Sequence, residues 1–363
     1  MPRRLAGAGI ATMAQPMTTP SSPASAKTES QKFTSVPKLA LTLMVGVLGG
    51  LALYLVGFPA AWLTGSAVAV AILAISGHAV MVPQRLQQLA FLLIGVSMGG
   101  GMSPDTLERI SEWPASIVLL VVLIMAATLA SYQILTRYGG WDRVTAMCGA
   151  IPGNLSLVVA TALEQGAATE RVAIAHTLRL LVLLVVVPPA VALVATETVA
   201  LARPASAGLI DTLILLAGGL LIGSFMASGA LHAFGVVETV LPRPIVGGAL
   251  VLLGTAIGAR FAGVSLATFL HVLLASTASL TAGLLVCLVP AAGFALVTGL
   301  ALPQVLLAFA PGGIEAMITL AFVLDSDVPY VAALHMIRVV TLAIALPLLL
   351  RFVASDRDAE RPR

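Results

Sequence analysis

Eleven apolar runs, each long enough to cross the hydrocarbon core of a membrane, follow one another along the chain. A core about 30 Å thick takes an apolar helix of about 20 residues, and strands facing lipid would leave backbone groups unpaired. The sequence therefore predicts an all-α fold, a polytopic membrane helix bundle with about 11 transmembrane helices and a range of about 10 to 12. The runs lie at 39–57, 60–77, 86–102, 115–135, 145–164, 172–194, 209–234, 243–259, 264–289, 303–324 and 329–350.

The composition excludes two broad classes of protein. Of 363 residues, 59% are apolar and 10% are charged, and the mean hydropathy is +1.05, so a soluble globular fold is excluded. The net charge is only +3, and the basic residues are scattered through short connections. Because nucleic-acid binding needs a gathered basic surface, no nucleic-acid partner is expected.

The two ends of the chain differ from the apolar part. Residues 1–38 are rich in Ser, Thr, Pro and Ala and carry five basic residues against one acid, Glu29. Such a segment buries too little apolar surface to offset its ordering entropy, so it is predicted to be a disordered cytoplasmic tail. A cleaved targeting peptide is the alternative. Residues 352–363 form a second, short charged tail.

The apolar part contains one sequence unit twice. A shift of 159 residues aligns the Ile151-Pro-Gly segment with Ala310-Pro-Gly, and it aligns His176 and Arg179 with His335 and Arg338. The same shift superimposes two Gly-x-x-x-Gly pairs, at 95–99 and 254–258, whose small residues favour close helix packing. We therefore predict a first repeat at 58–195, a second at 209–351, and an extra first helix at 39–57.

The helix count predicts the orientation of the repeats. Equivalent helices are five apart, so the two copies are expected to cross the membrane in opposite directions, as inverted repeats do in many secondary transporters. The basic residues of the connections favour an amino end on the inner side. The predicted location is the cell membrane, as a multi-pass protein of a bacterial inner membrane, in contact with the lipid bilayer and with a homo-oligomer left open.

Each repeat contains a Pro-Gly break inside an apolar run. Proline removes a backbone donor, so a helix is expected to stop there and another to begin just after it. A helix start offers free N–H groups and a positive dipole end, which suit an anion or a polar group. Asn154, Ser156 and Glu315 lie at these starts, where helix capping is the alternative role. The predicted substrate-binding residues are Pro152, Gly153, Asn154, Ser156, Arg179, Pro311, Gly312, Gly313, Glu315 and Arg338.

The two arginines lie where a charge is costly. From a helix start near Arg171, Arg179 is roughly 12 Å along the axis, which is too deep for easy snorkelling. An arginine at mid-membrane costs at least about 2.5 kcal/mol, so both arginines are expected to have a partner. One hypothesis is that they serve a transported solute or proton. The alternative is that each binds carbonyls freed at the break of its own repeat. His176, His335 and Glu315 are candidates for carrying a coupling proton.

Other chemistry-bearing residues are isolated in the sequence. His78, His232 and His271 are solitary, and Cys148 and Cys287 have no partner at metal-ligand spacing. Metal binding by proteins uses clustered ligands. We therefore predict no metal site, no cofactor and no catalytic residues.

The duplicated motifs resemble those of the AbrB-type membrane proteins. That family is known for a duplicated domain with an Ala-Pro-Gly-Gly-like signature, followed by a helix with a His- or Gln-x-x-Arg pattern. The resemblance covers about 45–350. The second copy, from Ala310 to Glu315, is the closer match, whereas the first departs at Ile151, Asn154 and Ser156. Members are described as transporters, as ammonia monooxygenases and as regulators of gene expression, and these descriptions disagree.

The residues rank these three functions. We predict a secondary transporter of a small anionic or zwitterionic solute, working by alternating access and using a coupling proton. The second hypothesis is a non-transporting receptor or regulator that affects gene expression indirectly. The third is a membrane oxygenase, which would need a redox metal or an organic cofactor held by several ligands. An enzyme is therefore not expected.

Overall fold

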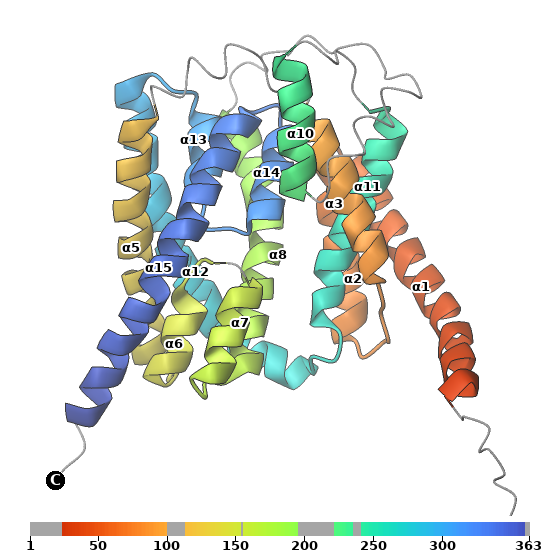
Figure 1. Ribbon diagram of the computed structural model, residues 1–363, viewed down its shortest axis with the longest axis horizontal. Helices are drawn as coiled ribbons and strands as arrows, with labels where there is room; N and C mark the ends of the chain where they lie inside the picture. Colours follow the sequence, from red (N-terminus) through yellow and green to blue (C-terminus); the bar gives the residue numbers. More distant parts are fainter. Residues whose placement is uncertain (1–23, 100–112, 154, 195–220, 235–240, 360–363) are drawn as a thin grey trace, which may run out of the picture. The chain divides into compact units, whose positions relative to one another are not determined.

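The computed structural model describes residues 24–99, 113–153, 155–194, 221–234 and 241–359, and these residues form helices and short connections without a strand. Figure 1 shows how the helices are arranged. In chain order they are α1 (Ala24–Leu55), α2 (Ala61–Ile75), α3 (Gln84–Gly99), α5 (Pro114–Arg137), α6 (Arg143–Ala150), α7 (Leu155–Glu164), α8 (Thr169–Val194), α10 (Leu221–Ala233), α11 (Arg243–Gly258), the 3-10 helix η2 (Ala259–Phe261), α12 (Leu266–Thr298), α13 (Leu302–Phe309), α14 (Ile314–Val323) and α15 (Val328–Ala359).

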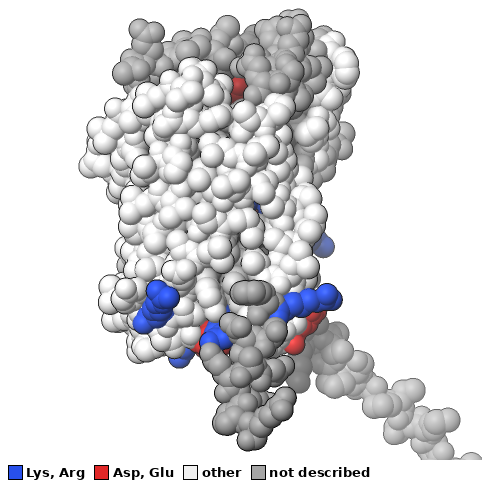
Figure 2. Space-filling view, turned by 90° about the vertical axis from the view of Figure 1, so that its left-hand side faces the viewer, with Lys and Arg blue, Asp and Glu red and all other residues white. Residues whose placement is uncertain are grey.

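The helices have the length and the surface of membrane spans. Within the described residues, six helical segments are long and apolar enough to cross a membrane. They are Val36–Leu55, Pro114–Arg137, Thr169–Val194, Arg243–Phe261, Leu266–Thr298 and Val328–Arg351. On the face in Figure 2, charged side chains gather near the lower end, and most of the height above them is uncharged. The predicted all-α fold is therefore confirmed for the described residues, and six of their helical segments have the length and composition of membrane spans, whereas α2 and α14 are shorter apolar helices.

The first and last helices extend beyond the apolar runs. α1 begins at Ala24, inside the predicted tail at 1–38, and α15 continues to Ala359, inside the predicted tail at 352–363. The α1 extension contains the helix formers Ala, Lys, Glu and Gln, and the α15 extension contains Ala and Arg, so both can add turns to an existing helix at little cost. Residues 1–23 and 360–363 lie outside the described part. Residues 38–363 form one unit by their contacts, and the packing below concerns that unit.

The sequence repeat is also a structural repeat. α6 and α13 begin and end 159 residues apart, and so do α7 and α14, and α3 and α11. Even the turn before the last helix is repeated. Gly166 and Asp325 are equivalent, and both have positive φ, at 67° and 50°. A non-glycine residue pays a steric cost for that conformation, so the shared geometry marks a common architecture in the two halves.

Glycines bring helices of opposite halves into close contact. A Cβ added at Gly254 would lie 2.3 Å from the carbonyl oxygen of Leu63, and one at Gly258 would lie 2.5 Å from that of Ala67. α11 is thus held directly against α2. A Cβ at Gly99 would lie 2.4 Å from that of Ser228, which places α3 equally close to α10. The close packing that the Gly-x-x-x-Gly spacing predicts is present at these three positions.

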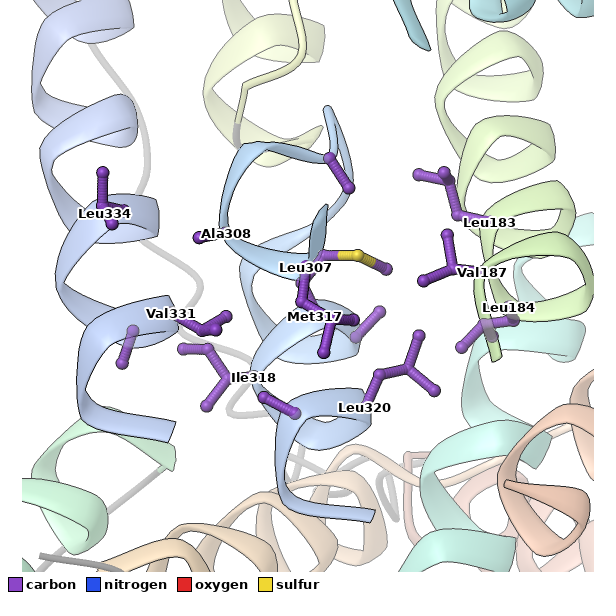
Figure 3. Close-up of a cluster of buried hydrophobic side chains, with 14 of the residues drawn as sticks. Leu183, Leu184, Val187, Leu307, Ala308, Met317, Ile318, Leu320, Val331 and Leu334 are labelled. Atoms are coloured by element: carbon purple, nitrogen blue, oxygen red, sulfur yellow. The ribbon is translucent and has the colours of Figure 1, made fainter. Parts of the chain in front are cut away.

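The helices from α2 onward fall into two groups. The paired-helix group consists of α2, α3, α10, α11 and η2, and the broken-helix group consists of α5 to α8 and α12 to α15. The groups meet mainly where α8 packs on α2 and α14 packs on α3. Figure 3 shows the apolar core beside this boundary, with α14 between α8 and α15. Leu183 of α8, Met317 and Leu320 of α14 and Val331 of α15 are fully buried there.

One hydrogen bond crosses from α2 to α8 within this apolar boundary. Pro188 lies inside α8 and has no N–H, so the carbonyl of Leu184, four residues earlier, loses its helical donor. Thr64 Oγ1 of α2 donates to that carbonyl at 2.9 Å. The rest of the boundary is largely apolar side chains, so few directional contacts tie the two groups together there.

Candidate functional site

Both Pro-Gly segments interrupt a helix in the same way. α6 ends at Ala150 and α7 begins at Leu155, while α13 ends at Phe309 and α14 begins at Ile314. In each gap a glycine N–H turns back to the carbonyl two residues earlier. The distance is 2.9 Å from Gly153 N to Ile151 O and 2.8 Å from Gly312 N to Ala310 O. The breaks that the prolines predict are therefore present, and they form one repeated turn.

Each arginine binds the carbonyl end of the broken helix in its own repeat. Arg179 Nη1 donates to Ile151 O at 3.1 Å, and its Nη2 donates to Gly149 O at 2.8 Å and Ala150 O at 3.2 Å. The last carbonyls of a helix lack intrahelical donors and carry its negative dipole end. A guanidinium group, with five N–H donors and a fixed positive charge, satisfies both needs.

The second repeat reproduces this contact. Arg338 Nη1 donates to Ala310 O at 2.7 Å, and its Nη2 donates to Gly312 O. Ala310 is the equivalent of Ile151, so the two Nη1 bonds are one contact seen twice. Arg179 is 8% exposed and Arg338 is 1% exposed. These are the bonds that the carbonyl-binding interpretation predicts, and a solute-binding role depends on what else the guanidinium groups face.

The two histidines differ in the hydrogen bonds of their rings. His176 Nε2 lies 3.0 Å from the carbonyl oxygen of Cys148. His335 lies beside the equivalent carbonyl, that of Leu307. Within the described residues, however, neither of its ring nitrogens has a hydrogen-bond partner, and neither has Arg338 Nε. A buried polar atom without a partner is costly. The second repeat therefore holds unused hydrogen-bonding capacity that the first repeat does not show.

A cavity of about 250 Å³ joins the two repeats. Both breaks, both arginines and His176 line it, so residues far apart in the sequence share one space. A smaller hollow of about 10 Å³ also touches Pro152, Arg179 and Pro311, so the two breaks lie close together. The lining residues of the larger cavity are Pro152, Gly153, Leu155, His176, Arg179, Leu180, Arg260, Pro311, Gly312, Gly313, Ile314, Glu315, Arg338 and Val339.

The cavity wall is rich in positive charge. Leu155 and Ile314 are the first residues of α7 and α14, so two helix N-termini contribute positive dipole ends. The negative ends of α6 and α13 are capped by the arginines. Glu315, in the first turn of α14, is the acidic residue of the lining. Such a wall attracts an anion or the carboxylate of a small molecule.

Most of the predicted site residues meet at this cavity, and a few do not. The lining includes both prolines and Gly153, Gly312 and Gly313, together with Arg179, Arg338, Glu315 and His176. His335 lies outside the lining. Asn154 lies outside the described residues, as does the side chain of Ser156.

Arg260 was missed by the sequence analysis. It lies in η2, directly after the second Gly-x-x-x-Gly helix, and it lines the cavity from the paired-helix group. The 159-residue shift pairs it with Gly101, so the repeat gave no signal for it. The fold places this third arginine on the wall of the cavity that the other two arginines also line.

The described residues bring no three His, Cys, Asp or Glu side chains together as a metal-binding group. Cys148 and Cys287 are buried free cysteines in different helices.

Comparisons with known proteins match this sequence to a family model and to two relatives. The model of a family described as "Transition state regulatory protein AbrB" matches residues 6–100 and 62–354. The "Uncharacterized protein YhjN" of Bacillus subtilis (strain 168) is 27% identical over 354 residues, covering 84% of this chain and 90% of that protein. The "Putative regulator AbrB" of Escherichia coli (strain K12) is 24% identical over 339 residues, covering 87% and 95%. No solved structure matches the chain.

Proposed function

The chain belongs to the AbrB family, and from this premise we propose that it is a secondary transporter that moves a small anionic or zwitterionic solute by alternating access. The observation that carries the proposal is the cavity of about 250 Å³ that both Pro-Gly breaks and both arginines line. Transporter sites are built from discontinuous helices whose half-helix N-termini face the solute. The proposed membrane is the cell membrane.

We propose that the chain crosses the membrane eleven times and that its repeats are inverted. In Figure 1, α6 and α7 lie toward the lower end, whereas α13 and α14 lie toward the upper end. α8 rises from the lower end and α15 descends toward it. Equivalent helices that run in opposite directions are what an odd number of spans per repeat produces. An inverted pair supports alternating access because each half can adopt the arrangement of the other.

The proposed movement is a displacement of the broken-helix group against the paired-helix group. The boundary between the groups is largely apolar, and the Thr64–Leu184 hydrogen bond crosses it. The cavity takes residues from both groups, since Arg260 belongs to η2 and Arg179 and Arg338 belong to α8 and α15. Displacement of one group would therefore open the cavity first to one side of the membrane and then to the other.

The arginines have a double role in this mechanism. Their hydrogen bonds hold the broken ends of α6 and α13, and their charges raise the potential in the cavity for an incoming anion. Glu315 is the proposed carrier of the coupling proton, because it is the carboxylate of the lining. His176 and His335 extend this proposed proton site. Each lies three residues before the arginine of its own helix, about one helical turn away.

Uptake into sealed vesicles tests the proposal. Purified protein is reconstituted into liposomes and supplied with labelled small carboxylates and amino acids, chosen by thermal-shift screening. The wild-type protein is expected to accumulate at least one of them. Arg338→Gln should abolish uptake while the protein still inserts, whereas Arg351→Gln, an exposed position on the same helix, should not. Unchanged uptake by Arg338→Gln would remove this residue from the site.

A membrane receptor is the second candidate, because the matching family model and the Escherichia coli relative are both described as regulators. A receptor would bind the solute in the same cavity and change its contacts with a regulatory partner. The same vesicles separate the two functions. Binding of a labelled solute without any accumulation in the vesicle interior would favour the receptor and contradict the transporter.

A further inference from the structure

The charges that line the cavity do not balance. Arg179, Arg260 and Arg338 contribute three positive charges, and Glu315 contributes one negative charge. The helix dipoles do not change this balance, because two helix C-termini and two helix N-termini meet at the site. The arginine and glutamate charges of the wall therefore sum to two uncompensated positive charges. Charges of the same sign are costly to hold together away from water without a partner. A bound solute with two negative charges would therefore be strongly favoured.

Arg260 differs from the other two arginines in the hydrogen bonds that it forms with the described residues. Arg179 and Arg338 are engaged with backbone carbonyls. Within the described residues, the Arg260 guanidinium forms no hydrogen bond or ion pair. It is partly exposed and lies on the cavity wall. A guanidinium in this state offers a planar pair of donors that fits a carboxylate in bidentate fashion.

The backbone under Arg260 is firmly held. η2 is a single 3-10 turn, and its last residue, Phe261, is fully buried. The Phe261 ring meets the ring of Phe269 edge-on, with centroids 5.7 Å apart. η2 also packs against both α2 and α8. Arg260 thus projects from an anchored turn, which limits the entropy lost when its side chain binds a ligand.

We propose that the solute is a small dicarboxylate, and that Arg260 binds one of its two carboxylates. The other carboxylate is held by the N-termini of α7 and α14 together with the charges of Arg179 and Arg338. This inference rests on the proposed function, because it names the solute class of the same cavity. A dicarboxylate fits the two binding centres because its anionic groups are separated by a carbon chain. A phosphate ion carries its charge at one centre, and a zwitterionic amino acid would leave the net charge of the wall uncompensated.

The size of the cavity limits the dicarboxylate. Sites for drug-sized ligands occupy about 300–1,000 Å³, and this cavity of about 250 Å³ lies below that range. A solute with a short carbon chain is therefore expected. Because Arg260 belongs to the paired-helix group and the other binding groups belong to the broken-helix group, the solute would bridge the two groups. Solute binding would then stabilise the arrangement seen here.

Binding to the purified full chain tests this inference with four probes: succinate as the dicarboxylate, propionate as the monocarboxylate, alanine as the zwitterion and inorganic phosphate as the single-centre anion. Succinate is expected to raise the unfolding temperature most and to bind most tightly. Arg260→Gln should weaken succinate binding by at least about tenfold, because a charge-assisted bidentate contact is lost. It should change propionate binding by less than about threefold. Arg243→Gln, at an exposed position of the preceding helix, is the matched control and should bind succinate normally.

Other binding results would contradict the inference in different ways. Tighter binding of propionate, alanine or phosphate than of succinate, or binding of none of the four, would overturn the dicarboxylate assignment. An equal loss of succinate and propionate binding in Arg260→Gln would overturn the role of Arg260. Uptake of succinate into vesicles is then measured separately. Tight succinate binding without uptake would support the ligand class and contradict only the transporter function. Uptake of alanine but not of succinate would support the transporter function and contradict only the dicarboxylate assignment.

Discussion

Thr64 of α2 donates a hydrogen bond to the carbonyl oxygen of Leu184 in α8, at 2.9 Å. The carbonyl is available because Pro188 supplies no N–H four residues later. The bond is fully buried at the boundary between the two helix groups. A proline in the broken-helix group is thus paired with a hydroxyl of the paired-helix group, and this bond connects two groups whose other contacts there are largely between apolar side chains.

Thr64→Val tests this contact. The substitution keeps the shape of the side chain and leaves the Leu184 carbonyl without a donor, so the free energy of unfolding should fall by about 1 kcal/mol. The measurement is reversible unfolding in detergent micelles. Thr64→Ser retains the hydroxyl and serves as the control. Equal stability of the valine variant and the wild type would show that the bond does not contribute.

Gly254 and Gly248 allow a matched comparison within α11. A Cβ at Gly254 would lie 2.3 Å from Leu63 O, whereas nothing lies within 4 Å of a Cβ at Gly248. Gly254→Ala should push α11 away from α2 and lower the unfolding free energy by about 1–3 kcal/mol. Gly248→Ala should raise it by up to about 1 kcal/mol through helix propensity. If both variants are equally stable, α11 is not packed on α2 as described.

Arg179→Lys separates charge from hydrogen-bond geometry. Lysine keeps the positive charge, but its ammonium group cannot span the carbonyls of Gly149, Ala150 and Ile151 as the guanidinium does. The thermal unfolding midpoint should therefore fall, and succinate binding should weaken by at least about tenfold. Arg171→Lys, at the start of the same helix, is the control. Wild-type stability in Arg179→Lys would mean that charge alone suffices at this position.

The inverted arrangement predicts opposite exposure of equivalent turns. Gln165 and Asp325 lie in the exposed turns that follow α7 and α14. In a background without Cys148 and Cys287, Gln165→Cys and Asp325→Cys should react with a membrane-impermeant thiol reagent from opposite sides of sealed vesicles. Labelling of both from the same side would contradict inversion of the repeats and would favour parallel copies.

Glu315→Gln tests proton coupling. Removal of the ionisable group should abolish succinate accumulation driven by an imposed proton gradient, while exchange of labelled for unlabelled succinate at equal concentrations should persist. Glu170→Gln, at the exposed start of α8, should retain both activities. Accumulation by Glu315→Gln at the wild-type rate would assign the coupling role to another group.

The sequence predicted the parts of the fold that depend on local chemistry. Apolar runs predicted helices, Pro152 and Pro311 predicted breaks, and the spacing of Arg179 and Arg338 after them predicted partners at those breaks. Each of these depends on residues in one short segment or on a repeat visible by a shift. The number of spans was harder to predict, because α2 and α14 are apolar yet shorter than a membrane is thick.

The long-range features could not be predicted from one sequence. Arg260 has no counterpart in the repeat, and its approach to the cavity depends on how α11 packs against α2. The Thr64–Leu184 bond joins residues 120 positions apart. His176 contacts the carbonyl of Cys148 at 3.0 Å, whereas within the described residues the ring nitrogens of His335 have no hydrogen-bond partner. Sequence spacing carries no information on such contacts, because packing between segments decides them.

The hydrogen bond from each arginine to its own break affects how the two duplicated halves can diverge in sequence. Arg179 binds the carbonyl end of the broken helix in the first half and Arg338 that in the second, so each half supplies the partner of its own break. Arg260, supplied only by the second half, breaks that parity. The duplicated halves are therefore free to diverge at the ligand while their interrupted helices stay under the same constraint. Substitutions that retune selectivity should accumulate around Arg260 and not at the paired arginines.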